Sequence, residues 1–264
     1  MPSGSVSFDR AADYYDATRG FPPGEEQAVA RLFAQAGGLS DRSLVLEIGV
    51  GTGRIALPLA RHVGMLVGVD ISRQMVDRLL AKRTDEPVYP VLADATRLPF
   101  AHHQFDAAVA VHVFHLISAW QQALEELARV LRPDGCLLHG LHPHDEDTAT
   151  MWRAFRREMD RVIPPETMQH IGVPFERSQT FLQEEGWRPI GAPLVHSYEV
   201  RHTPNQMLDR YRGRCYSMSW RMTAADHARL ITALETMARE VYGDLDREIV
   251  EQSRFMVQAY RPPQ

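Results

Sequence analysis

The stretch Leu44-Val-Leu-Glu-Ile-Gly-Val-Gly-Thr-Gly53 decides how the rest of the chain is interpreted. An apolar run contains an acid, Glu47, and leads to three glycines separated by single residues. Glycine lacks Cβ, so Gly49, Gly51 and Gly53 can adopt backbone angles closed to other residues and let a ligand lie against the main chain. The stretch predicts a buried strand that turns sharply into a helix around a ligand.

Two other ligand-binding loops occur at the same place in α/β folds, and the spacing argues against both. Dinucleotide-binding turns have a third glycine three residues after the second, where this chain has Arg54. A P-loop needs Gly-Lys-Ser/Thr, which this site lacks. A glycine turn with a purely structural role is the alternative that this motif leaves open.

Acids after the next two predicted strands extend the pattern. The run Met65-Leu-Val-Gly-Val-Asp70 ends in a carboxylate that can accept both hydrogens of a ribose diol. Ile71, directly after it, offers an apolar surface for an adenine ring. A third strand, residues 87–92, leads to a second acid, Asp94. Three strand ends in succession therefore carry groups suited to one nucleoside ligand.

These motifs, with a later Arg129-Val-Leu-Arg-Pro-Asp-Gly135 turn, resemble class I S-adenosylmethionine-dependent methyltransferases of the small-molecule type. The resemblance covers roughly residues 44–142 and implies S-adenosylmethionine as the cofactor. In the family, the acid at Asp94 takes the adenine amine, and the backbone N–H of the next residue meets the ring. The implied cofactor-binding residues are Tyr15, Arg19, Glu47, Gly49, Gly51, Gly53, Asp70, Ile71, Asp94, Ala95 and His112.

The leading segment also resembles the family, where a stretch of the kind F-D-x-x-A-x-x-Y-D-x-x-R packs over the cofactor. Here it begins at Phe8, so Tyr15 and Arg19 would face the methionine carboxylate or close the site. An N-terminal helix that is merely docked by its aromatic side chains is an equally good interpretation.

The resemblance implies an α/β fold with a doubly wound, seven-stranded, mostly parallel sheet. Its expected strand order is 3-2-1-4-5-7-6, with strand 7 antiparallel and with helical cap insertions. We expect a single Rossmann-like methyltransferase domain over residues 1–264. It would contain an N-terminal helical lid (1–37), a cofactor-binding core (38–144) and helical acceptor-side elements (145–190 and 204–243).

Sequence patterns predict where the later elements lie. The predicted helices are at about 25–36, 73–82, 120–131, 148–162, 176–185, 204–218 and 223–242. The predicted last two strands are at 193–202 and 248–260. The forty residues between these strands, where the family has a hairpin, would roof the acceptor pocket with Tyr211, Tyr216 and Trp220.

Composition narrows the functional classes. The chain has 264 residues, 44% hydrophobic and 24% charged, enough for a substantial core. A net charge of −5 argues against broad nucleic-acid binding, and we interpret the arginine clusters at 153–161 and 210–214 as solvated faces. No apolar run approaches a membrane span, so we expect a cytoplasmic monomer or homodimer with a small-molecule acceptor.

Histidines supply the candidate catalytic groups, because imidazole titrates near neutral pH. His115, just past the fourth predicted strand, is the predicted general base for a protic acceptor, whereas packing or substrate shaping is its alternative role. His139 and His142 would form a polar lip of the active site. With His144 they suggest a metal site, but their spacing covers a strand end and a proline-containing loop, so we expect no bound metal.

The predicted reaction is methyl transfer from S-adenosylmethionine to a small-molecule O, N or C nucleophile by in-line displacement. Two alternatives stay open. One is a methyltransferase that acts on a tRNA base or a protein side chain, and the other is a non-catalytic S-adenosylmethionine-binding module.

Overall fold

The computed structural model describes most of the chain, in two compact units. The described residues are 5–143, 150–164, 171–174, 177–178 and 180–263. The first unit, here the sheet unit, comprises residues 1–142, 170–196 and 255–264. The second, the helical unit, comprises residues 143–169 and 197–254.

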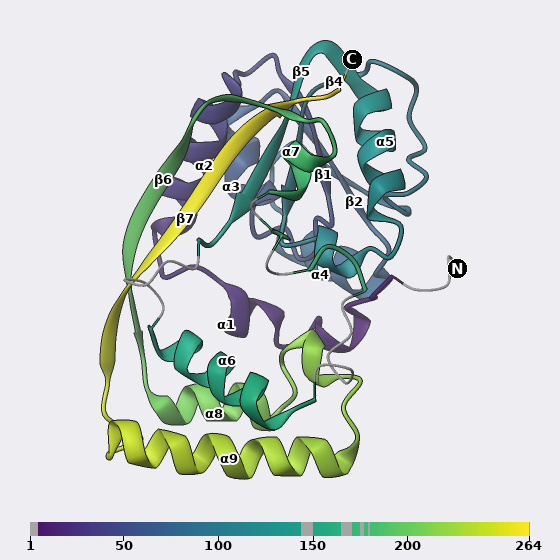
Figure 1. Cartoon of the computed structure of the whole chain (residues 1–264). Helices are drawn as coiled ribbons and strands as arrows, with labels where there is room; N and C mark the ends of the chain where they lie inside the picture. Colours follow the sequence, from purple (N-terminus) through teal and green to yellow (C-terminus); the bar gives the residue numbers. More distant parts are fainter. Residues whose placement is uncertain (1–4, 144–149, 165–170, 175–176, 179, 264) are drawn as a thin grey trace. The chain divides into compact units, whose positions relative to one another are not determined.

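Seven strands form one sheet with the order β3-β2-β1-β4-β5-β7-β6, as predicted (Figure 1). The strands are β1 (Leu44–Ile48), β2 (Met65–Asp70), β3 (Val88–Leu92), β4 (Phe105–Val111), β5 (Leu131–Leu141), β6 (Arg188–His202) and β7 (Ile249–Arg261). The first five pair in parallel, and β7 pairs with β5 in the antiparallel sense, which confirms the predicted orientation.

The central strand β1 aligns the residues that carry the chemistry. Glu47 of β1 lies opposite Gly68 of β2 and Val109 of β4. Val45, Leu46 and Ile48 are fully buried, as expected for a parallel strand covered on both faces. Because these neighbouring strands are parallel, their carboxyl ends meet at one edge of the sheet, where α/β folds bind ligands.

β5 begins with a looped-out segment. Its pairing with β4 moves from Leu131 to Cys136 while β4 advances by only two residues, from Phe105 to Ala107. Residues 132–135 therefore bulge out of the ladder, which is how the predicted Arg-Pro-Asp-Gly turn fits inside a strand. Cys136 is buried, and burial raises its pKa to about 11.

Short helices cover the sheet of the sheet unit (Figure 1). They are η1 (Asp9–Ala11), α1 (Tyr15–Arg19), α2 (Glu25–Gly37), α3 (Ala56–Leu59), η2 (Ala60–His62), α4 (Arg73–Lys82), η3 (Phe114–Leu116), α5 (Trp120–Val130) and α7 (Phe181–Glu184). Ser72 caps α4 by accepting the Met75 N–H at 3.2 Å. The helix predicted at 176–185 is reduced to the single turn α7, although residues 176 and 179 lie outside the described part.

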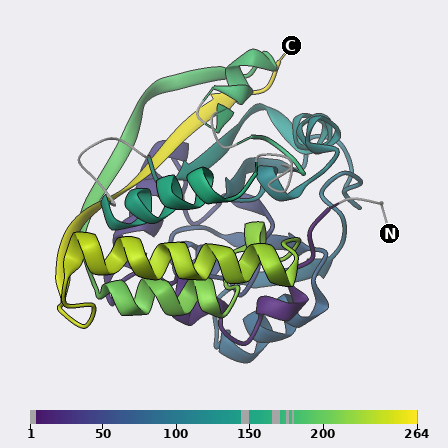
Figure 2. The same cartoon turned by 60° about the horizontal axis from the view of Figure 1, so that its bottom comes forward.

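Three helices build the helical unit, together with the turn η6 (Ser217–Ser219). They are α6 (Thr150–Val162), α8 (Pro204–Arg212) and α9 (Ala224–Tyr242), and α9 runs alongside both of the others (Figure 2). Thr203 begins α8 with a capping box. α8 ends six residues before the predicted limit, because Gly213 follows it and Arg214 has a φ of +51°. Cys215, just after this end, is partly exposed.

Apolar residues four apart fill the core of the helical unit. α6 contributes Met151, Phe155 and Met159, and α9 contributes Leu230, Leu234 and Ala238. Each set lies on one face of its helix, as the helical period requires. Val241 lies about one turn after Ala238 on α9 and is 61% exposed. No helix in the described residues is long and apolar enough to cross a bilayer.

Candidate functional site

The glycine loop after β1 has the left-handed backbone that the sequence predicts. Gly49, Gly51 and Gly53 have φ values of +66°, +54° and +80°, which residues with a Cβ rarely adopt. A Cβ on Gly49 would lie 2.5 Å from a methyl of Val113, in the segment after β4. The loop is therefore closed against the end of β4 as well as open to a ligand.

Asp70 joins this loop to the end of β2. Its two carboxylate oxygens accept the backbone N–H groups of Gly51 and Ser72, each at 2.8 Å. Burial raises the pKa of Asp70, and the two N–H groups oppose that shift. Each oxygen keeps a further lone-pair direction, so the carboxylate can still accept a hydroxyl pair from a ligand.

Asp94 lies beside Asp70, because the N–H of Ala93 donates to the Asp70 carbonyl at 3.0 Å. One oxygen of Asp94 accepts both the N–H and the hydroxyl of Thr96, at 2.9 and 2.8 Å. The other oxygen, Oδ2, is buried and has no hydrogen-bond partner among the described residues. A buried acceptor of this kind is costly unless something donates to it, so Oδ2 marks a place for a ligand N–H.

Glu47 is only 2% exposed in β1, and its Oε2 atom is a second buried oxygen without a partner in the described chain. Burial raises the pKa of Glu47 well above its usual value, and the cation of Arg54 opposes the shift. Burial therefore favours the protonated form of the side chain, in which it can donate as well as accept a hydrogen bond.

The N-terminal segment binds the ligand-facing loops through carboxylates that the sequence analysis missed. Asp9 accepts the Ser72 hydroxyl at 2.6 Å at the start of α4. Asp16 accepts the Thr52 hydroxyl at 2.5 Å and pairs with Lys82 at 2.7 Å. The spacing of Asp9, Asp13 and Asp16, four and then three residues, was the available signal, because it places the acids on one side of a helical segment.

Tyr15 and Arg19, the predicted cofactor-binding residues of this segment, lie at its docked face. Tyr15 packs edge-on to Phe8, with ring centroids 6.0 Å apart. The Arg19 carbonyl accepts a hydrogen bond from the Arg54 guanidinium at 2.7 Å. The aromatic contact is thus internal to the segment, the polar bond joins the segment to Arg54 after the glycine loop, and a role for either side chain in cofactor binding stays a prediction.

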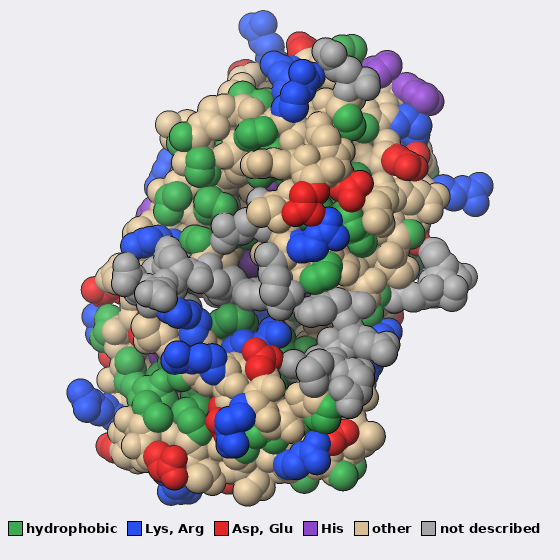
Figure 3. Space-filling model, in the orientation of Figure 1, with side chains coloured by type: hydrophobic (Ala, Val, Ile, Leu, Met, Phe, Trp, Pro, Cys, Tyr) green, Lys and Arg blue, Asp and Glu red, His purple; other side chains and the backbone are tan. Residues whose placement is uncertain are grey.

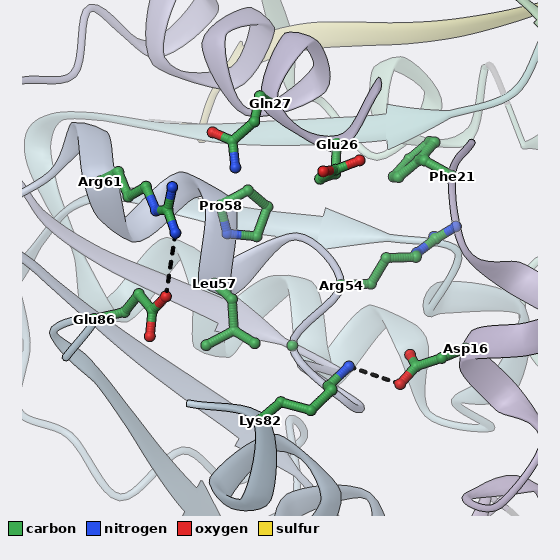
Figure 4. A pocket seen from close by; sticks show the side chains of 11 residues that line it. Asp16, Phe21, Glu26, Gln27, Arg54, Leu57, Pro58, Arg61, Lys82 and Glu86 are labelled. Carbon is green, nitrogen blue, oxygen red and sulfur yellow. Dashed lines mark hydrogen bonds and ion pairs between the residues drawn. The ribbon is translucent and has the colours of Figure 1, made fainter. Parts of the chain in front are cut away.

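A pocket of about 310 Å³ opens on the outer side of the glycine loop (Figure 4). It is lined by Asp16, Phe21, Glu26, Gln27, Gly53, Arg54, Leu57, Pro58, Arg61, Lys82 and Glu86. Lys82 pairs with Asp16 across it, and Arg61 lies 3.6 Å from Glu86. Asp70 and Asp94 are not in its lining. We therefore place the ligand site at the strand ends that carry these two acids and not in this pocket.

The predicted histidines separate into three environments. The Nε2 atom of His112, after β4, lies 2.8 Å from the Nδ1 atom of His142, after β5. His139 is buried against Phe114 and Phe181, and burial lowers its pKa to about 4. His115 is exposed on η3. The strand ends therefore bring His112 and His142 into hydrogen-bonding contact.

The remaining predicted substrate residues lie in the helical unit. Tyr211 and Tyr216 are buried in its core, with ring centroids 4.8 Å apart, and the Trp220 indole donates to the Arg214 carbonyl at 2.7 Å. His144 lies outside the described residues. Within the described part, no three His, Cys, Asp or Glu side chains cluster as metal ligands would.

Known proteins are similar to this chain over the part that carries the glycine loop and the strand-end acids. Residues 46–139 match the model of a methyltransferase domain. Methyltransferase GfsG of Streptomyces halstedii is 37% identical over 117 residues, which cover 42% of this chain and 40% of that protein. Malonyl-[acyl-carrier protein] O-methyltransferase of Herminiimonas arsenicoxydans is 37% identical over 139 residues, 51% of this chain and 49% of that protein.

A solved structure extends the similarity over the fold. YcgJ of Bacillus subtilis superposes with a TM-score of 0.58 and 21% identity, covering 91% of this chain and 99% of that one. This likeness concerns the fold alone. Among the curated relatives compared, the chain spans from 25% to 56% of their length.

Proposed function

We propose that this chain, which contains a class I S-adenosylmethionine-dependent methyltransferase domain, methylates a small-molecule O, N or C nucleophile. The cofactor of this family is S-adenosylmethionine. The observation that carries the proposal is the unpartnered, buried Oδ2 atom of Asp94 beside the glycine loop. It offers an acceptor where the adenine amine of this cofactor would need one.

The residues present fit the cofactor along its length. Asp70 would accept the ribose hydroxyls with its remaining lone pairs, and Ile71 would lie against the adenine ring. Asp94 would accept the exocyclic amine, while the N–H of Ala95 meets the ring. The methionine half would lie over Gly51, where a Cβ would meet nothing nearer than 3.9 Å, and the backbone of His112 would be a further contact.

The bound cofactor supplies an activated methyl group on a sulfonium, so the protein has little covalent chemistry of its own to perform. Its residues must hold an acceptor in line with the methyl carbon at a separation of about 3 Å and exclude water. Tyr15 and Arg19 would close the site, held by the bonds of Asp9 and Asp16 to the loops below them. An acceptor that must lose a proton also needs a base, for which the sequence predicts a histidine after β4, His115 first.

A small acceptor is favoured over a nucleic acid by the distribution of charge. Side chains of both signs are interspersed on the face drawn in Figure 3. Three of the seven arginines in the two clusters of the helical unit are paired with acids: Arg156 with Asp160, Arg161 with Glu158, and Arg212 with Asp209 and Glu235. Phosphate binding needs cations that are available to a partner. One relative is named as an O-methyltransferase of malonyl-[acyl-carrier protein], which is not a nucleic acid.

Isothermal titration with S-adenosylmethionine and S-adenosylhomocysteine, with NAD as the control, tests the cofactor. We expect micromolar binding of the first two and none of NAD. Preference for NAD would overturn the proposal. Release of S-adenosylhomocysteine in the presence of an acceptor then separates an enzyme from a non-catalytic binding module, which would bind the cofactor without turning it over.

A further inference from the structure

The contact between His112 and His142 is a hydrogen bond in the plane of the two rings. The ring planes differ by 11°, and the centroids are 5.1 Å apart. Parallel rings stacked face to face would keep their atoms at least about 3.5 Å apart, whereas the two nitrogens approach to 2.8 Å. The imidazoles therefore meet edge to edge, and one nitrogen at the contact carries the proton while the other accepts it.

Aromatic rings contact His142, the second member of the pair. Phe255 meets the His142 ring edge-on at 5.0 Å and the Phe21 ring at 5.5 Å. Phe21 lies 6.2 Å from His142, and the Arg54 guanidinium lies 4.8 Å from the Phe21 ring centre. Apolar walls lower the local dielectric constant, which strengthens a hydrogen bond and favours proton transfer along it over exchange with water.

The backbone holds His112 in place at the edge of the cofactor loop. Its φ is +49°, an unusual value for a residue with a side chain. The next residue, Val113, packs where a Cβ on Gly49 would have to be. A left-handed residue at a strand end, locked against the glycine loop, fixes the direction of the imidazole beside the methionine half of the proposed cofactor site.

We propose that His112 and His142 form a proton-sharing pair in which His112 takes the proton of the acceptor and His142 positions it and carries the charge onward. The proposal rests on the methyl transfer proposed above. It shifts the role of base from His115, which is exposed on η3, to His112, which is half-buried after β4.

The proton balance is complete within the pair. The acceptor's O–H or N–H bond breaks, its proton forms an N–H bond at Nδ1 of His112, and its electron pair forms the bond to the methyl carbon. The electron pair of the broken S–C bond stays on sulfur. The proton on Nε2 of His112 then passes to Nδ1 of His142, and the proton on Nε2 of His142 leaves to water.

Charged groups on the surrounding elements set the background for any titration of the pair. They are Arg54 in the glycine loop and the buried Glu47 on β1. The Arg54 cation opposes the gain of a positive charge by an imidazole, and burial raises the pKa of Glu47, which favours its neutral form. A pH effect must therefore be assigned with variants and not from wild type alone.

Nuclear magnetic resonance of the full chain, labelled with 15N-histidine and saturated with S-adenosylhomocysteine, reads the pair directly. We expect complementary tautomers at the contact, and we expect His112→Asn to shift the titration midpoint of His142 by at least half a pH unit. His102→Asn, on an exposed loop residue, is the matched control and should shift neither ring. If His142 titrates identically with and without His112, the pair does not share a proton and the proposal is wrong.

Turnover supplies the second readout, using phenols, catechols, primary amines and carboxylic acids as probe acceptors. His142→Asn keeps a hydrogen-bonding atom near Nδ1 but cannot pass a proton on. We expect kcat to fall by about 100-fold, with KM unchanged and the pH profile altered. Unchanged turnover in both His112→Asn and His142→Asn, with cofactor binding intact, would sink this proposal alone. Lack of cofactor binding in wild type would sink the proposed function instead, and if no probe is methylated the resonance experiment decides.

Discussion

The glycine loop of the sheet unit and the helix core of the helical unit are specified in different ways. In the loop, single residues decide the structure: three glycines have positive φ, and Asp70 bonds two backbone N–H groups. In the helix core, Leu230, Leu234 and their neighbours fill space, and several residue types of similar volume would serve. Function is thus concentrated in a few positions of the first region, while stability is spread over many positions of the second.

Asp70→Ala should give the largest effect and tests the glycine loop, where single residues decide the structure. Each hydrogen bond to a charged group contributes about 1.5–3 kcal/mol, so loss of two ribose bonds should weaken S-adenosylmethionine binding at least about 100-fold. Calorimetric titration measures it. Asp77→Ala, an exposed acid on α4 paired with Arg73, is the control and should leave affinity unchanged. Full affinity in a folded Asp70→Ala protein would remove the ribose assignment.

Leu234→Ala tests the helix core, where stability is spread over many positions. The residue is fully buried between helices, so the substitution should lower the free energy of unfolding by about 2–5 kcal/mol in a urea titration. Val241→Ala, on the same helix at 61% exposure, should change it by less than about 0.5 kcal/mol. Cofactor affinity of the folded Leu234→Ala protein should match wild type. A parallel loss of affinity would show that the contrast between the two regions is wrong.

Asp94→Asn should have a smaller effect. It tests the role of one atom of the site, Oδ2 of Asp94. The amide places a donor where the adenine amine needs an acceptor, so S-adenosylhomocysteine binding should weaken about 10-fold. S-inosylhomocysteine has an oxygen in place of that amine. The wild-type protein should prefer the adenine compound, and the variant should lose or reverse this preference. Equal discrimination by both proteins would contradict the role of Oδ2.

His139 gives the smallest expected effect at neutral pH, because its contribution appears only in acid. Its folded pKa of about 4 lies below the ordinary value of 6.5, so the unfolded chain binds a proton first as the pH falls. The free energy of unfolding should therefore decrease from pH 6.5 towards 4, by about 2 kcal/mol at pH 5. His139→Leu should remove this part of the slope in urea titrations at pH 7.5 and 5. The same slope in both proteins would mean that the imidazole reaches water.

The parts of the site that could be predicted from the sequence depend on residue identity at fixed spacing. Gly49, Gly51 and Gly53 have positive φ, and Asp70 and Asp94 lie side by side at adjacent strand ends. These positions follow from strand order and from the glycine pattern alone. The strand order and the antiparallel last strand followed in turn from the family resemblance, and the structure confirms both.

The parts that could not be predicted depend on distances between segments far apart in the chain. The contact of His112 with His142 joins residues thirty positions apart and needs the left-handed backbone at His112, which no local pattern announced. Asp16 meets Thr52 thirty-six positions away through a segment with little regular structure. The early end of α8 arose from Arg214, whose positive φ is unusual for its residue type.

The two cysteines differ in accessibility, so a thiol-reactive dye can label the native chain selectively. A thiol-reactive dye needs an accessible thiolate, and Cys136 is buried with a pKa of about 11, whereas Cys215 is partly exposed. A dye added to the native protein at neutral pH should therefore attach to the helical unit first. Its fluorescence would then follow events in that unit while a bound ligand is titrated into the other, with no substitution anywhere in the sequence.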